Sequence, residues 1–163
     1  MRIAIWTLLL AGCAGGASGL DTAAGGDPTD TPAGANGAVF KGPLVAGSTV
    51  SVQALDDQAQ PLDLWSESTV SNDMGDYEIE IAHEGLVRIT ASGQFLDEAT
   101  GSRSENTLVM TGLAELSSGA DNTVHVNMLT DLTHLRVEAL MADGLAYPDA
   151  TAQAEAELIQ ALH

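Results

Sequence analysis

The single cysteine, Cys13, carries the most distinctive chemistry in this sequence of 163 residues. One cysteine cannot form a disulfide within the chain, so its thiol is free, bridged to another molecule or an attachment point. It follows an apolar run, residues 3–11, behind the positively charged Arg2. Because a membrane-spanning helix needs about 20 apolar residues, this run is too short to cross a bilayer but suits a secretory signal.

The four histidines do not combine into a metal or catalytic site. His134 and Glu138 lie one helical turn apart, but two ligands do not make a zinc site. His125 occupies an outward-facing position in a predicted strand. The sequence also lacks the GxSxG, SxxK, HExxH and phosphate-loop motifs. We therefore predict no catalytic residues, no cofactor and no metal site, and a protein that is not an enzyme.

Carboxylates in the expected turns raise a calcium hypothesis. Loops at one end of a β-sandwich can supply the oxygen ligands that Ca²⁺ requires. None of these carboxylates has the Asp-x-Asp-x-Asp-Gly spacing, so we expect them to stabilise turns in water, with Ca²⁺ binding as the alternative. They are Asp56, Asp57, Asp73, Asp76, Asp97 and Glu98.

The residues around Cys13 resemble the lipobox of bacterial lipoproteins, with the sequence LAGC at residues 10–13. In that family the cysteine thiol receives diacylglycerol, the chain is cut just before it, and the new amino group is acylated. The resemblance implies a signal peptide at residues 1–12 and a lipid anchor on Cys13. Several acyl chains hold a protein more firmly than one, because each buried methylene adds about 0.8 kcal/mol.

The residue after Cys13 has a further implication for location. It is Ala14, whereas an aspartate there tends to retain Gram-negative lipoproteins at the inner membrane. The resemblance therefore implies the outer membrane, with the protein facing the periplasm or the cell surface. The membrane is then the first expected partner, through the lipid on Cys13.

The composition is strongly acidic, with 5 Lys+Arg, 23 Asp+Glu and a formal net charge of -18. Nucleic-acid binding needs basic side chains that neutralise phosphates, and adsorption to anionic lipid needs basic clusters, so neither is expected. The charge indicates a solubilising surface. Aromatic residues make up 4%, which leaves few stacking platforms for sugars or bases. Trp65 is one candidate platform, although a lone tryptophan more often covers the edge of a core.

Residues 13–36 and 37–128 differ sharply in composition. The first segment contains one large apolar residue, Leu20. Burial of so little apolar surface cannot offset the conformational entropy lost on ordering, so we predict a disordered linker after Cys13. From Gly37, short runs alternate apolar and polar residues between turn residues, which predicts strands with one buried face. Roughly six or seven such strands predict a mainly β fold, a small antiparallel β-sandwich. The residues expected to face inward are Val50, Val52, Ala54, Tyr77, Ile79, Ile81, Val87, Ile89, Ala91, Val124, Val126 and Met128.

The same region resembles the carboxypeptidase regulatory-like domain, a prealbumin-like (transthyretin-like) sandwich. GAVFKGPLVAGSTVSV at residues 37–52 is similar to its opening, and TVSNDMGDYEI at residues 69–79 resembles its turn signature. In this signature Gly75 takes a positive φ and Tyr77 is the first inward residue of the next strand. Residues 95–101 look like a segment of some bacterial relatives, with Phe95 in place of tyrosine. The resemblance implies a fold and no peptidase activity.

Two helices are predicted in residues 129–163. Asn127 or Thr130 caps the first, and Gly144 suits its C-terminal end. One side of this helix holds Leu129, Leu132, Leu135 and Ala139, and Val137 and Met141 lie on roughly the opposite side. A helix that is apolar on two sides needs two packing partners. The second helix starts at Pro148, and its apolar stripe is Ala150, Ala154, Leu158 and Leu162.

Residues 127–133 loosely match a segment of bacterial lipoproteins in which the helical region continues further. This similarity suggests a truncated or shortened member, and the alternative is that the second helix closes the domain. The predicted function is a lipid-anchored cell-envelope protein whose non-catalytic sandwich is a structural or interaction module for an unknown envelope protein or glycan. The alternatives are a carbohydrate- or Ca²⁺-binding module and an N-terminal fragment of a larger envelope protein.

Overall fold

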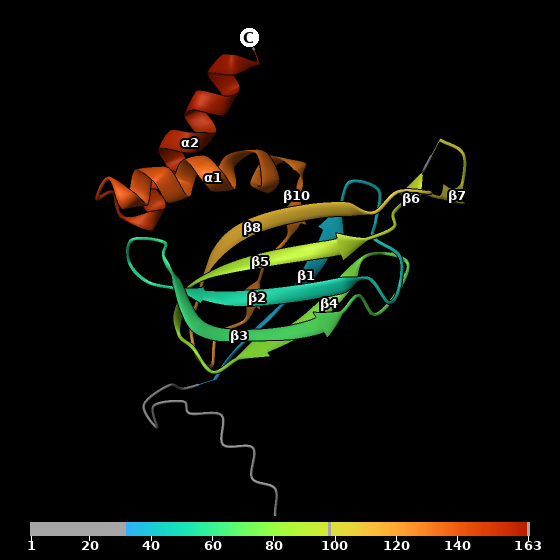
Figure 1. The fold of residues 1–163 in the computed structure, drawn as a ribbon, viewed down its shortest axis with the longest axis horizontal. Helices are drawn as coiled ribbons and strands as arrows, with labels where there is room; N and C mark the ends of the chain where they lie inside the picture. Colours follow the sequence, from blue (N-terminus) through green and yellow to red (C-terminus); the bar gives the residue numbers. More distant parts are fainter. Residues whose placement is uncertain (1–31, 98, 163) are drawn as a thin grey trace, which may run out of the picture.

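A computed structural model of the chain describes residues 32–97 and 99–162. These residues form two sheets packed face to face, a small hairpin and two C-terminal helices (Figure 1). The strands are β1 (Ala33–Phe40), β2 (Thr49–Leu55), β3 (Pro61–Thr69), β4 (Asp76–Ile81), β5 (Gly85–Gly93), β6 (Leu96–Asp97), β7 (Ser102–Arg103), β8 (Leu108–Leu116), β9 (Asn122–Thr123) and β10 (Val126–Asn127), and the helices are α1 (Met128–Ala142) and α2 (Tyr147–Ala161).

One sheet has the order β3-β2-β5-β8, and all its neighbours are antiparallel. The other has the order β10-β1-β4, and β9 also pairs with β1. The β1–β4 pair is antiparallel, whereas the two-residue strands β9 and β10 run parallel to β1. The predicted mainly β sandwich followed by two helices is therefore confirmed, with two short parallel pairings that the sequence did not indicate.

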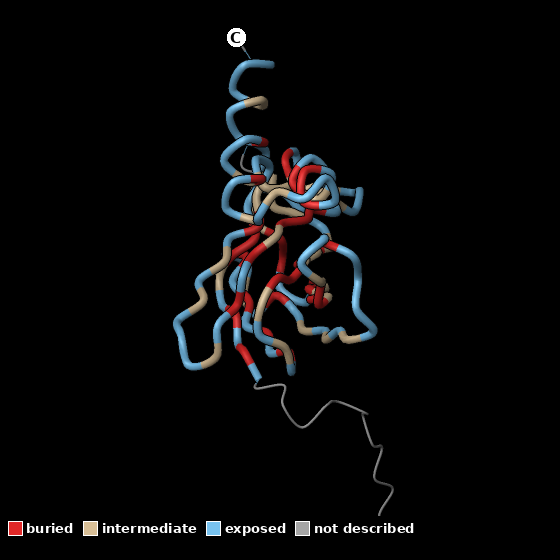
Figure 2. Tube along the Cα trace, turned by 90° about the vertical axis from the view of Figure 1, so that its left-hand side faces the viewer, coloured by how far each residue is buried: buried red, intermediate tan, exposed pale blue. Residues whose placement is uncertain are grey.

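The strand alternation predicted the core correctly. The inward residues of β2, β4 and β5 are all buried, as is Val126 of β10, and together they fill the space between the sheets (Figure 2). Val124 is half-buried and packs against this core. Met128 was expected inside but is 46% exposed, because it is the first residue of α1 and no longer follows the strand alternation.

The sandwich begins four residues before the predicted boundary at Gly37. Residues 33–36 were expected in the disordered linker, but they form the first half of β1 and pair with β4. Ala33 and Ala35 are 1% and 2% exposed and lie opposite Ile81 and Ile79. The small side chains of Ala33 and Ala35 fit between closely packed strands. In the sequence, the same small residues resemble the composition of a linker.

Strand β3 was not predicted, and Trp65 lies within it. The strand is at one edge of its sheet. Its inward positions carry Leu64, Ser66 and Ser68, which are only partly buried. Because two of these three residues are serines, the apolar alternation that marks a strand is nearly absent there.

Helix α1 lies against the outer face of the β3-β2-β5-β8 sheet, nearest to β8, and α2 packs on α1 (Figure 1). Asn127 is the N-cap of α1, and its side chain accepts hydrogen bonds from the backbone N–H groups of Leu129 and Thr130. Gly144 takes a φ of 100° just after the helix, which a residue with a side chain rarely adopts. Ala150 and Ala154 of α2 are 0% and 2% exposed, and their small side chains allow the helices to approach closely.

Candidate interaction surfaces

The inner side of α1 is fixed to the sheet by both apolar and charged contacts. Val137, Leu140 and Met141 are buried in a second apolar cluster, separate from the sandwich core. The Glu138 carboxylate binds the guanidinium of Arg88 on β5 at 2.7 Å. Asp131 accepts a hydrogen bond from the Thr111 N–H on β8 at 2.9 Å. These contacts set the rotation of α1 about its axis.

The opposite side of α1 is a row of exposed apolar side chains, which we term the outer stripe. Met128, Leu132 and Leu135 are 46%, 57% and 68% exposed, and Ala139 and Ala142 continue the row. Successive members are four, three, four and three residues apart, so they stay on one side of the helix. The sequence indicated two apolar sides for α1, and only one of them has a partner among the described residues.

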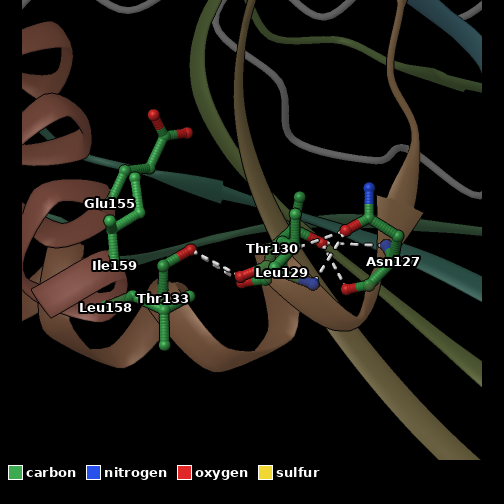
Figure 3. A pocket seen from close by; sticks show the side chains of 7 residues that line it. All are labelled: Asn127, Leu129, Thr130, Thr133, Glu155, Leu158 and Ile159. Atoms are coloured by element: carbon green, nitrogen blue, oxygen red, sulfur yellow. Dashed lines mark hydrogen bonds between the residues drawn. The ribbon is translucent and has the colours of Figure 1, made fainter. Parts of the chain in front are cut away.

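The C-terminal half of α2 carries further exposed apolar side chains. Ile159 and Leu162 are 58% and 73% exposed, and Leu158 is half-buried. Between this end of α2 and the start of α1 lies a hollow of about 330 Å³, the helical groove (Figure 3). Its lining residues are Asn127, Leu129, Thr130, Thr133, Glu155, Leu158 and Ile159.

The charges near the helical groove are mostly neutralised within the chain. Arg136 of α1 binds Glu157 of α2 through two hydrogen bonds of 2.7 and 2.9 Å. The hydrogen bonds from Arg136 and, secondly, from Gln153 lower the pKa of Glu157 from 4.5 to about 2. Within the described part of the chain, the carboxylate of Glu155 lines the groove without an ion pair.

All four cationic side chains of the described residues are already engaged. Arg88, Arg103 and Arg136 each form an ion pair with a carboxylate of this chain. The Lys41 ammonium lies 5.8 Å from the centre of the Phe95 ring, within cation–π range. The acidic residues that remain exposed therefore have no basic partner in residues 32–97 and 99–162.

Two of the described histidines, His125 and His134, make local contacts. The Nδ1 atom of His134 is 2.7 Å from the backbone oxygen of Asp131, and Glu138 is bound to Arg88 instead. His125 is exposed, and its Nδ1 accepts a hydrogen bond from the Ala38 N–H. Across the described residues, no three His, Cys, Asp or Glu side chains gather in a way that could hold a metal ion.

Four of the turn carboxylates accept hydrogen bonds within the chain, and two of them, Asp56 and Asp97, accept from the backbone of their own turns. Asp56 accepts hydrogen bonds from the N–H groups of Gln58 and Gln60. Asp97 accepts one from the Ala99 N–H, and this bond is the largest cause of its lowered pKa. Asp73 accepts one from Ala46 and forms a 3.7 Å ion pair with Arg103. Asp76 accepts one from the Asn72 side chain. Glu98 lies outside the described residues.

A second surface surrounds Trp65 on the outer face of the β3-β2-β5-β8 sheet. Its side chain is 63% exposed, and its Cα pairs with that of Gln53 on β2. The next positions on this face are polar, because Ser51 of β2 pairs with Glu67 of β3 and with Thr90 of β5. We term this tryptophan and its polar neighbours the sheet platform.

The predicted lipid attachment site, Cys13, lies outside the described residues, as does the predicted signal peptide. Neither α1 nor α2, the helices of the described residues, has the combination of length and hydropathy required to span a membrane.

Neither a protein-family model nor a curated protein matches this sequence. Among solved structures, a 9R-lipoxygenase from Cyanothece is similar, with 10% sequence identity and a TM-score of 0.33. The similarity covers 82% of this chain and 25% of the lipoxygenase chain, so this chain spans about a quarter of that protein's length. A similarity this weak supports no conclusion about activity.

Sequence reasoning missed part of the apolar surface. Met128 was assigned to a strand, and Ile159 lies outside the four-residue stripe expected for α2. The signal for Met128 was present, since it stands four residues before Leu132 in the row that ends at Ala142. Ile159 could be found only with the placement of α2 on α1.

Proposed function

We propose that this chain is a lipid-anchored cell-envelope protein whose non-catalytic β-sandwich acts as a structural or interaction module. The observation that carries the interaction role is the outer stripe, the row of exposed apolar side chains on α1. Large exposed apolar patches on a soluble domain mark binding surfaces, because they would otherwise cost free energy in water. The lipid anchor on Cys13 rests on the LAGC sequence at residues 10–13.

The proposal includes a sandwich of the carboxypeptidase regulatory-like type. It is supported by the turn that contains Gly75, where φ is 84° and the backbone oxygen accepts a hydrogen bond from the Val39 N–H. It is also supported by Tyr77, which is 3% exposed and is the first inward residue of β4. These are the roles that the resemblance implies for the two residues.

The proposed location is the outer membrane, with the domain facing the periplasm or the cell surface. Ala14 after the anchor cysteine supports this location, because an aspartate there favours retention at the inner membrane. In this arrangement the acyl groups on Cys13 contact the membrane and the acidic domain remains in water.

The test is expression of the full chain in a Gram-negative host, followed by intact-mass analysis. We expect a chain that begins at Cys13 and carries the added mass of the acyl groups, found in the outer-membrane fraction. The Cys13→Ser variant should lack the lipid and leave that fraction. A mature protein with a bare thiol, or with residues 1–12 still attached, contradicts the proposal.

A second candidate function is carbohydrate binding at the sheet platform. The observation that favours it is Trp65, whose exposed ring stands among serine, threonine and glutamine side chains. An aromatic ring can stack on the apolar face of a sugar while neighbouring polar groups bind its hydroxyls.

Tryptophan fluorescence tests this alternative directly. The chain has 2 tryptophans, and Trp6 lies in the predicted signal peptide, so Trp65 is the sole reporter after cleavage. Titration with soluble glucose and N-acetylglucosamine oligomers should change its emission if the platform binds sugars. The Trp65→Ala variant should lose binding in isothermal titration calorimetry, whereas Leu135→Ala in the outer stripe should retain it. An unchanged emission up to millimolar oligomer removes this candidate.

A further inference from the structure

We infer that the open edge of strand β3 binds one extended segment of a partner protein as an added β-strand, and that this segment alternates Lys or Arg with small apolar residues. This inference rests on the proposed interaction function and names the kind of partner. It concerns the sandwich, and it depends neither on the lipid at Cys13 nor on the outer stripe.

The sandwich is closed on one side and open on the other. On the closed side β8 lies against β10 and is contacted by α1, and β9 and β10 occupy the second edge of β1. On the open side β3 and β4 are the last strands of their sheets (Figure 1). Among the described residues, β3 pairs only with β2, and β4 pairs only with β1. A sheet edge of this kind can accept a strand from another chain.

The backbone groups of alternate residues in β3 point to the open side. Along a strand these groups point in turn to its two edges. Val70, just after β3, binds the segment before β2 through both its N–H and its oxygen, and the Leu64 oxygen accepts a hydrogen bond from a β2 side chain. The backbone groups of Trp65 and Glu67 therefore point away from β2, where the described sheet has no further strand. These are the groups that an added strand binds.

An open hollow of about 320 Å³ lies between β3 and β4 at this side of the sandwich. Ser66 and Ser68 occupy inward positions of β3 and are only partly buried, so no large side chain of β3 covers the hollow at these positions. Small apolar side chains on an added strand fit over these serines. The residues that line the hollow are Ser66, Glu67, Ser68, Glu78, Ile79 and Glu80.

The charges at this edge favour a basic segment over a second copy of this chain. Glu67, Glu78 and Glu80 line the hollow, and none of them forms an ion pair with a described residue. Charged side chains on an edge strand commonly oppose pairing between identical chains. A second copy brings the same carboxylates and a formal charge of -18, whereas Lys or Arg on a partner is attracted.

Trp65 and Glu67 determine why the basic residues should alternate. Both side chains are exposed on the outer face of the sheet, two residues apart. Residues of an added strand that lie opposite them share this face. A lysine or arginine opposite Glu67 faces its carboxylate, and one opposite Trp65 lies within reach of its ring. The residues between them face the hollow and the serines.

The direct test uses nine-residue peptides, which match the length of β3, and the full chain carrying Cys13→Ser, which prevents acylation. The first peptide alternates lysine and valine. A second has glutamate in place of every lysine. We expect the first to bind in calorimetry and the second to bind about tenfold more weakly or not at all.

Two methylated peptides distinguish strand addition from attraction between charges alone. One carries N-methyl groups on its lysine amides and the other on its valine amides, and each methyl removes a backbone donor. All neighbours in this sheet are antiparallel, and in antiparallel pairing the residue opposite Glu67 directs its N–H toward β3. Methylation of the lysine amides should therefore abolish binding, whereas methylation of the valine amides should preserve it.

Hydrogen exchange followed by NMR locates the bound strand on the parent chain. The amide protons of Trp65 and Glu67 point to the open edge, so they should exchange about tenfold more slowly when the first peptide is saturating. This measurement does not depend on any variant of β3.

Charge-reversal variants test the hollow. Glu67→Lys and Glu80→Lys should each weaken binding of the first peptide about tenfold. Glu105→Lys is the matched control, because it makes the same change of charge at an exposed residue outside the hollow. It should bind nearly as the parent chain does. Circular dichroism melting checks that each variant is folded.

Four results overturn the inference. They are equal binding of the two methylated peptides, unchanged exchange of the Trp65 and Glu67 amides, equal weakening by Glu67→Lys and Glu105→Lys, and slow exchange of these amides in a peptide-free dimer. The last result assigns the edge to a second copy. The mass of the mature chain tests the lipid anchor separately, and the outer stripe takes no part in these experiments, so failure of either idea is recognised independently.

Discussion

Arg136 of α1 and Glu157 of α2 hold each other through two parallel hydrogen bonds, from Nε to Oε2 at 2.7 Å and from Nη2 to Oε1 at 2.9 Å. This geometry fixes distance and orientation together, because the guanidinium and the carboxylate are both planar. The pair ties the middle of α1 to the C-terminal half of α2, next to Leu158 and Ile159 of the helical groove. The shape of the groove therefore depends on this contact.

We predict that the Arg136–Glu157 pair makes stability depend on acid pH. The pKa of Glu157 is about 2 in the folded chain and 4.5 as the ordinary value, so the unfolded chain takes up the proton first as the pH falls. The stabilisation is complete above about pH 4.5 and is lost toward pH 2. In urea unfolding, the parent chain should lose more stability between pH 5.5 and pH 2.5 than Glu157→Gln does.

The effect of this pair is expected to be small and sensitive to salt, because both side chains are partly exposed, at 45% and 41%. Glu155→Gln on the same helix is the control, since Glu155 forms no ion pair with a described residue. It should keep the pH dependence of the parent chain. Identical pH profiles for Glu157→Gln and the parent chain contradict the prediction.

Tyr77→Phe should destabilise the sandwich by about 1–2 kcal/mol. The Tyr77 hydroxyl donates a 2.7 Å hydrogen bond to the Val124 backbone oxygen and thereby joins β4 to the segment between β9 and β10. Burial raises the pKa of Tyr77, so the hydroxyl keeps its proton through neutral pH. Urea unfolding measures the loss. Trp65→Phe, on an exposed aromatic side chain, should change stability by less than about 0.5 kcal/mol, and equal effects of the two changes argue against the role of this bond.

Gly75→Ala and Gly47→Ala should differ in cost although both glycines have similar backbone angles. Their φ values are 84° and 86°, and an alanine at such an angle costs about 1–2 kcal/mol. A Cβ at residue 75 would lie 2.6 Å from the Val39 backbone oxygen, whereas a Cβ at residue 47 meets nothing within 4 Å. The change at Gly75 should therefore cost at least about 1 kcal/mol more, by urea unfolding. Equal losses contradict the steric argument.

Asn127→Ala should lower stability by about 1 kcal/mol, because it removes the cap at the start of α1. The Asn127 side chain accepts hydrogen bonds from Leu129 N–H at 2.8 Å and from Thr130 N–H at 3.2 Å. Asn127→Asp keeps an acceptor at this position and should retain most of the stability. Thermal melting followed by circular dichroism distinguishes the two variants. Equal melting temperatures for Asn127→Ala and Asn127→Asp mean that capping contributes little.

The sequence predicted strands in which apolar, buried residues alternate with polar, exposed ones. It missed strands that lack this alternation. In β4, Tyr77, Ile79 and Ile81 alternate with acidic residues, so the pattern is unambiguous. In β3, serines occupy two inward positions at an open edge. Strands β9 and β10 are two residues long, and their pairing with β1 depends on where the chain returns after β8.

The buried side of α1 could not be chosen from hydrophobicity alone. The side that carries Leu132 and Leu135 is richer in large apolar residues, yet the opposite side, with Thr133 and Val137, is the buried one. An ion pair between Glu138 and Arg88 accompanies the apolar contacts on the buried side. That contact joins residues 50 positions apart, and no local pattern contains it.

The first described strand and the helices lie at opposite poles of the molecule. Ala33 begins β1 on the side of the sandwich away from the helices, which lie nearest to β8 of the other sheet (Figures 1 and 2). In the proposed lipid-anchored protein, attachment at Cys13 lies on the N-terminal side of Ala33 in the sequence. The exposed leucines of α1, Leu132 and Leu135, would then lie on the side of the domain away from the point of attachment.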